Sequence, residues 1–224
     1  FLMKSLRNLS ISDNWKFQFD SSIIHSDGLD SLSIISNRID TLYDWILKNK
    51  NLKYFFWIKN KTYHVVNNDT SCINLTSFTF SEPYYFKLPT ILYRMQKLKV
   101  LALDLGIGAS YHGINKIIEC NADLEVLAIY GSNIKSVPSP IFDLKYLSDL
   151  VLCGGCIDNI PSSISQLKSL KTISLNNNRI QRLPEEIKEL NETLKELDLR
   201  GNPISPEEQE KIKRWLPNTR VDFD

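Results

Sequence analysis

Four cysteines and three histidines are the residues of this chain best suited to metal binding or nucleophilic chemistry. Two of the cysteines, Cys153 and Cys156, enclose the sequence CGGC. A C-x-x-C pair becomes redox-active or strongly nucleophilic when a helix begins at the motif, because the helix N-terminus stabilises the thiolate. Here the following residues predict an irregular segment in place of a helix. We therefore interpret the pair as ordinary small thiols, and a disulfide between them stays open as the alternative.

The remaining candidates for chemistry are weaker. His25, His64 and His112 lie in separate segments, without the spacing of a zinc site. The stretch LGIGASYHG at 105–113 has neither the lysine of a phosphate-binding loop nor a G-x-G-x-x-G pattern. Cys72 and Cys120 precede predicted strands and are expected to line the core. The sequence thus predicts a protein that is not an enzyme and holds no cofactor or metal.

The composition limits the classes of partner that the chain is expected to bind. The chain of 224 residues is 42% hydrophobic, which is enough to bury a substantial core. Its formal net charge is +1, so no overall field favours nucleic acid or an anionic membrane. No apolar run reaches the roughly 18 residues that a membrane span needs. A protein is therefore the expected partner.

The pattern L-x-x-L-x-L recurs along nearly the whole chain. Its apolar residues stand at positions one, four and six. The spacing of two between positions four and six is that of a short strand with one buried face. One such strand cannot bury that face alone, so successive coils must stack into a parallel sheet. The coils begin at Leu6, Leu29, Leu52, Leu75, Leu98, Leu124, Leu147, Leu170 and Leu194.

Two further positions complete the repeat. The ninth residue of a coil is often asparagine, whose amide can satisfy turn backbone groups that would otherwise be buried unpaired; these residues are Asn14, Asn37, Asn60, Asn178 and Asn202. The fifteenth is often proline, which suits an irregular return path better than a regular helix; these residues are Pro89, Pro138, Pro161 and Pro184.

The full pattern LxxLxLxxNxLxxLPxxIxxL, over about residues 6–204, resembles the leucine-rich repeat proteins, most of all bacterial ones such as those of leptospires. The resemblance implies an α/β solenoid with a short-stranded parallel sheet on the concave face and an irregular or short-helical convex side. It also implies protein binding, and for a bacterial protein a secreted or cell-surface location and host interaction. Two alternatives stay open: an intracellular scaffold similar to the Ras-suppressor type, and the recognition part of a larger enzyme.

Residues 1–224 are predicted to form a single domain that is closed at its C-terminus by a cap over 203–224. Ser205-Pro206-Glu207-Glu208 is a capping box with proline at the first helical position. The helix after it places Ile212, Trp215 and Leu216 on one face, and Val221 and Phe223 can add a last strand. No comparable cap begins at Phe1, so further chain or a partner is expected to cover that end.

The third, fifth and seventh positions of each coil point away from the core. Among them, apolar residues gather in coils three and five to seven, with polar coils on either side, and an apolar patch with a polar rim is typical of protein-binding sites. The alternative is that valine and alanine simply suit the surface of a sheet. The predicted partner-binding residues are Tyr54, Phe56, Ile58, Thr79, Ala102, Asp104, Ala128, Tyr130, Val151 and Cys153.

The same region departs from the repeat. In four successive coils the ninth-position asparagine is replaced, by Pro83, Gly106, Ser132 and Gly155, and coil five holds three extra residues. Because lapses of a local rule often mark function or strain, we expect the curvature to change near Gly106. We also expect the segment 110–113 to bulge from the rim.

Overall fold

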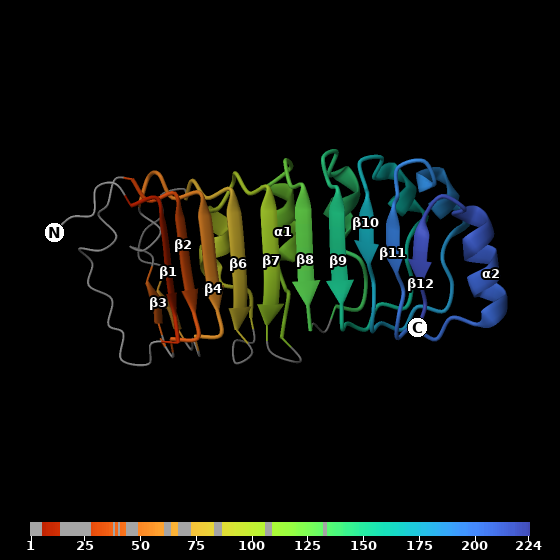
Figure 1. Ribbon diagram of the computed structural model, residues 1–224, viewed down its shortest axis with the longest axis horizontal. Helices are drawn as coiled ribbons and strands as arrows, with labels where there is room; N and C mark the ends of the chain where they lie inside the picture. Colours follow the sequence, from red (N-terminus) through yellow and green to blue (C-terminus); the bar gives the residue numbers. More distant parts are fainter. Residues whose placement is uncertain are drawn as a thin grey trace.

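The computed structural model describes residues 6–13, 28–37, 39, 41–43, 49–60, 64–66, 73–82, 87–105, 109–131 and 134–224. Within these residues ten strands form one sheet in which every neighbouring pair is parallel (Figure 1). The strands are β1 (Asn8–Ser12), β2 (Ser31–Ile35), β4 (Tyr54–Ile58), β6 (Ser77–Glu82), β7 (Val100–Leu105), β8 (Val126–Tyr130), β9 (Asp149–Cys153), β10 (Thr172–Ser174), β11 (Glu196–Asp198) and β12 (Arg220–Asp222). The predicted stacked solenoid is confirmed.

The core is a column of side chains from the fourth and sixth positions. Leu127 pairs in register with Leu101 and Leu150, and it is fully buried. Where the pattern has aromatic residues, they occupy the same column: the rings of Phe55 and Phe78 are 5.9 Å apart between centroids. The first coil is less enclosed, since its core positions in β1 are only half-buried. Large aromatic side chains therefore continue the core where the leucine pattern weakens.

Every regular coil ends its strand with a residue at positive φ in the eighth position. Gly201 has φ +69°, and non-glycine residues occupy the same place, such as Lys59 at +53° and Asn177 at +55°. The backbone N–H of this residue donates to a carbonyl of the next coil, as Asn177 does to Arg200 (2.8 Å). The left-handed turn ends the strand and brings the ninth residue inward.

The ninth-position asparagines form the predicted ladder. Asn178 is buried, and its Nδ2 donates to the carbonyls of Leu152 (2.7 Å) and Leu175 (2.9 Å). Its Oδ1 accepts from the backbone N–H of Ile157 (3.2 Å). Equivalent bonds are made by Asn37, Asn60 and Asn202, whereas Asn14 lies outside the described residues.

Coils four and five replace this turn with one more strand residue. Strands β6 and β7 extend to Glu82 and Leu105, and both side chains are buried. The carboxylate of Glu82 takes over the role of the missing asparagine, because its Oε1 accepts from the backbone N–H of Asn60 (2.7 Å). Pro83, Gly106 and Ser132 lie outside the described residues, so the expected change of curvature near Gly106 stays a prediction.

The return segments lie behind the sheet and carry short helices (Figure 1). Among the described residues, four of them are 3-10 helices, each preceded by one of the prolines noted above. These are η3 (Thr90–Arg94), η4 (Ser139–Asp143), η5 (Ser162–Gln166) and η6 (Glu185–Leu190). Coil five instead forms α1 (Ile114–Glu119), and coils two and three pair β3 (Thr41–Tyr43) with β5 (His64–Val66), a second small sheet that the pattern did not predict.

The C-terminal end is closed by α2 (Pro206–Trp215) and β12, as predicted. The hydroxyl of Ser205 accepts from the backbone N–H of Glu208 (3.2 Å), which is one half of a capping box. The reciprocal half does not form, because Glu208 Oε1 is buried without a hydrogen bond and Oε2 lies 3.5 Å from Lys211. Ile212 and Leu216 are buried against the last coil.

Candidate functional site

The open face of the sheet is paved by the outward side chains of consecutive strands. Strand pairing places Thr79, Ala102, Ala128 and Val151 side by side in one row across β6, β7, β8 and β9. Because side chains alternate along a strand, this row lies opposite the buried leucines. Four short side chains in succession form a low floor in the middle of the face.

Larger side chains rise at two places beside this floor. On β4, Tyr54 is 45% exposed, and Phe56 and Ile58 are half-buried. On β8, Tyr130 is 41% exposed. Strands β6 and β7 separate the two groups and contribute mainly small side chains, among them Thr79, Ser81 and Ala102.

Two of the predicted contact residues are less accessible than the pattern suggested. Ala128 is 5% exposed and Cys153 is 7% exposed, although both lie at outward positions. The short Ala128 is flanked by neighbours on β7 and β9, and the thiol of Cys153 lies 3.6 Å from the carbonyl oxygen of Ser174. Burial raises the pKa of this thiol, which makes it a poor nucleophile.

The charges on the face are unevenly distributed. Asp104 Oδ2 accepts a hydrogen bond from the Ser81 hydroxyl (2.8 Å). Asp149 accepts hydrogen bonds from the hydroxyls of Thr172 and Ser148. Neither carboxylate has a cationic partner among the described residues.

The last coils neutralise their own charge. Arg200 lies against Asp198, with Nη2–Oδ2 and Nε–Oδ1 distances of 2.8 and 2.9 Å. This ion pair holds the pKa of the Asp198 carboxyl well below its usual range. Asp104 on β7 and Asp149 on β9 thus keep their charges, and exposed Glu196 on β11 is a further carboxylate of the face.

The cysteines do not form a redox site in the described part of the chain. Cys120, Cys153 and Cys156 are free thiols, so the CGGC disulfide is not formed. The expectation that Cys120 lines the core is wrong, because the inward place beside it is taken by Asn121. Asn121 donates to the carbonyls of Met95 (2.9 Å) and Ile117 (2.8 Å), a convex-side analogue of the ladder that the repeat pattern did not reveal. Cys72 lies outside the described residues.

The insertion of coil five folds onto the core and opens a hollow beside it. Tyr111 is buried and donates from its hydroxyl to the carbonyl of Tyr130 (3.2 Å), while Ser110 and His112 are exposed. Gly113 then turns the chain at φ +88° against the hydroxyl of Tyr93, where any side chain would collide. The segment is thus pinned by Tyr111, and only its flanking residues project from the rim.

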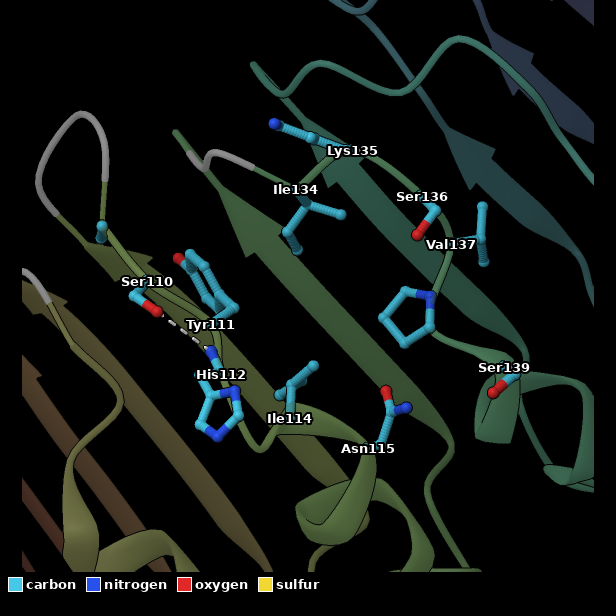
Figure 2. A pocket seen from close by; sticks show the side chains of 12 residues that line it. Ser110, Tyr111, His112, Ile114, Asn115, Ile134, Lys135, Ser136, Val137 and Ser139 are labelled. Carbon is cyan, nitrogen blue, oxygen red and sulfur yellow. Dashed lines mark hydrogen bonds between the residues drawn. The ribbon is translucent and has the colours of Figure 1, made fainter.

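This hollow of about 600 Å³ lies between the insertion and the start of the next return segment (Figure 2). Its polar groups come from Ser110, His112, Asn115, Lys135, Ser136 and Ser139. The Ser110 hydroxyl accepts from the backbone N–H of His112 (3.3 Å) and makes no bond to its imidazole (Figure 2). No serine–histidine pair of a nucleophilic enzyme is therefore assembled by the residues drawn there.

Neither a metal cluster nor a membrane-spanning helix occurs in the part of the chain that the structure describes. In it, no three side chains of His, Cys, Asp or Glu gather closely enough to hold a metal ion. No described helix combines the length and the apolar character that crossing a bilayer requires. His25 lies outside the described residues, and His64 belongs to β5.

Comparison with known proteins agrees with this architecture. Residues 145–204 match the family described as Leucine rich repeat. No curated protein matches the sequence. Among solved structures, the fold is similar to that of a leucine-rich repeat protein of Leptospira interrogans, with 20% identity, a TM-score of 0.52, and coverage of 98% of this chain and 84% of that one.

Two further solved structures have a similar fold and belong to longer chains. An internalin of Listeria monocytogenes shows 16% identity and a TM-score of 0.61, over 90% of this chain and 65% of that chain. The crystal structure of PEPR1-AtPEP1 shows 20% identity and a TM-score of 0.60, over 97% of this chain and 31% of that one. This chain therefore spans about two thirds of the internalin chain and about a third of the chain in the PEPR1-AtPEP1 structure. With its repeats, its ten-stranded parallel sheet and these similar structures, the chain has the leucine-rich repeat fold, and residues 145–204 carry the match to the family itself.

Proposed function

We propose that this solenoid is a non-catalytic module that binds another protein on the open face of its sheet, between β4 and β9. The observation that carries this proposal is the alignment of outward side chains from five adjacent strands into one continuous surface with exposed tyrosines at two places. Leucine-rich repeat folds typically bind proteins, and this chain has a fitting surface for that role.

The dimensions of the face suit such a contact. Five strands spaced by about 4.8 Å, each with about five residues rising 3.3 Å, give a platform of roughly 20 by 16 Å. That is the scale of the apolar centre of a standard interface, to which a polar rim is then added. Tyr54 and Tyr130 are the side chains that such a partner would bury, and tyrosine is enriched among residues that dominate binding energy.

We further propose that the module acts in a secreted or cell-surface protein of a bacterium and contacts host proteins. Its fold is shared with a leptospiral and a listerial protein, which supports this part of the proposal. An antibody against the module tests the location: it should label intact cells of the source organism. Labelling only after lysis would refute the location without touching the binding proposal.

The binding face is tested by affinity capture followed by mass spectrometry. Host extract and source-cell extract are passed over the wild type, the Phe56→Asp/Tyr130→Asp double variant, and a Tyr146→Asp control. Tyr146 is 60% exposed in the turn before β9, outside the row of outward strand positions. We expect partners captured by the wild type and the control to be lost from the double variant. Equal capture by all three proteins would overturn the proposal.

A further inference from the structure

The four strands β6 to β9 carry two carboxylates and no cation at their outward positions. These positions hold Ser77, Thr79, Ser81, Val100, Ala102, Asp104, Val126, Ala128, Tyr130, Asp149, Val151 and Cys153. Lysines lie at the rim just before these strands: Lys99 pairs with Glu125 (2.6 Å), and Lys171 lines a rim hollow beside Ser148. The hydrogen bonds to Asp104 and Asp149 come from hydroxyl groups, which leave the negative charges in place.

The two carboxylates stand at the ends of a diagonal across the face. Asp104 is the fifth residue of β7, and Asp149 is the first residue of β9. In register, Asp149 is level with Val126 and Val100, four residues back along the strand from Asp104. Two strand spacings of about 4.8 Å and four rises of about 3.3 Å put the two Cα atoms roughly 16 Å apart.

The middle of this diagonal is low and apolar. Ala128 lies on the strand between the two acids, two residues from the level of each. At one end, Tyr130 stands opposite Asp104 in the strand register and is partly exposed. An aromatic ring beside a carboxylate favours a guanidinium or ammonium group, since both attract a cation.

From this arrangement we infer that the occupant of the face is an extended protein segment with two cationic side chains, one on Asp104 and Tyr130 and one on Asp149, separated by small residues over Ala128. This deepens the proposed function and rests on it. Side chains of an extended segment alternate, so two cations on the same side stand an even number of residues apart. Four residues span about 13 Å, and the flexible stems of Arg and Lys cover the remaining few ångströms.

A phage-displayed library of random dodecapeptides tests the inference. Peptides selected on the wild type should be enriched in Arg or Lys at positions four residues apart, with small residues between. Selected peptides are then resynthesised and titrated against Asp104→Asn and Asp149→Asn, each of which keeps the shape and removes the charge. Each substitution should weaken the Kd about threefold to tenfold, and the effect should shrink as salt is added.

Two controls separate this inference from the proposed function. Asp143→Asn removes a carboxylate from η4 on the opposite side of the solenoid and should leave the Kd unchanged. Ala128→Arg fills the floor of the face and should abolish binding of any ligand there. The inference would be overturned if the selected peptides lacked paired cations, or if they bound both asparagine variants as well as the wild type. If Ala128→Arg still blocked those peptides, the face would stand as a binding site. Peptides indifferent to Ala128→Arg, or a library without enrichment, would contradict both.

Discussion

Removing one ladder asparagine, by Asn178→Ala, should lower the free energy of unfolding by about 3 kcal/mol. The side chain makes two bonds to the carbonyls of Leu152 and Leu175 and one to the N–H of Ile157, at 2.7, 2.9 and 3.2 Å. Each such bond contributes about 1 kcal/mol net, and the backbone groups left behind are buried. The loss should be concentrated in the coils next to the substitution, because each coil contacts only its neighbours.

Urea unfolding followed by circular dichroism measures the total change, and hydrogen exchange with mass spectrometry locates it. The matched control is Asn159→Ala, an exposed asparagine in the return segment just before. It should change the free energy of unfolding by less than about 0.5 kcal/mol. If Asn178→Ala cost under about 1 kcal/mol, or if the two alanine variants were equal, the ladder would not be a main support of the stacked coils.

Three further predictions concern the core, the Asp198–Arg200 ion pair and the thiols. Phe80→Ala, at a fully buried ring that stacks on Phe78, should lower the free energy of unfolding by about 3–5 kcal/mol in the same urea assay, and a value near zero would contradict the aromatic core. Asp198→Asn should destabilise the protein at pH 7, and its difference from the wild type should shrink progressively below about pH 4 and be clearly smaller at pH 2. The native pKa of Asp198 is held down mainly by Arg200, so its stabilisation is fully present above the unfolded pKa of about 4 and is lost as the pH falls from there through the lower folded pKa; an equal difference in urea midpoint at pH 7 and pH 2 would refute the ion pair. In native protein, thiol labelling with peptide mapping should modify exposed Cys120 well before buried Cys153, whose pKa is raised by burial, and the reverse order would show that the end of β9 at Cys153 is accessible.

The architecture was predictable because it follows from the regular spacing of the apolar residues along the chain. A strand of alternating side chains that recurs every two dozen residues can bury its apolar face only by stacking, so the leucine positions predict parallel register as well as fold. Leu127 and Leu175, at the fourth and sixth positions of their coils, are buried as the pattern predicts. The C-terminal cap followed from equally local signals at Ser205 and Pro206.

The features that the repeat pattern did not predict depend on hydrogen bonds between residues of different coils. Glu82 replaces a ladder asparagine from one position earlier, because its longer side chain reaches the backbone N–H of Asn60. Tyr111 pins the insertion by bonding to the carbonyl of Tyr130, nineteen residues away. The positive φ at the eighth position occurs at glycine but also at Lys59 and Asn177, so residue type alone does not mark it.

The sequence predicts which residues lie on the candidate face, but not how exposed each of them is. Alternation along each strand assigns Ala128 and Cys153 to the outward side, and strand pairing places them there. How deeply each is covered depends on the sizes of neighbours on adjacent strands, which is why both are buried while Tyr130 is exposed. Register also creates the diagonal of Asp104 and Asp149, which no reading along the chain would reveal.

Hydroxyl-radical footprinting of the protein with and without a captured partner tests the central claim most directly. Tyr54 and Tyr130 lie on the open face, whereas Tyr93 belongs to η3 on the opposite side, and all three are exposed. We predict that the partner protects Tyr54 and Tyr130 from oxidation and leaves Tyr93 unchanged. Protection of Tyr93 with full oxidation of both face tyrosines would show that binding occurs elsewhere on the solenoid.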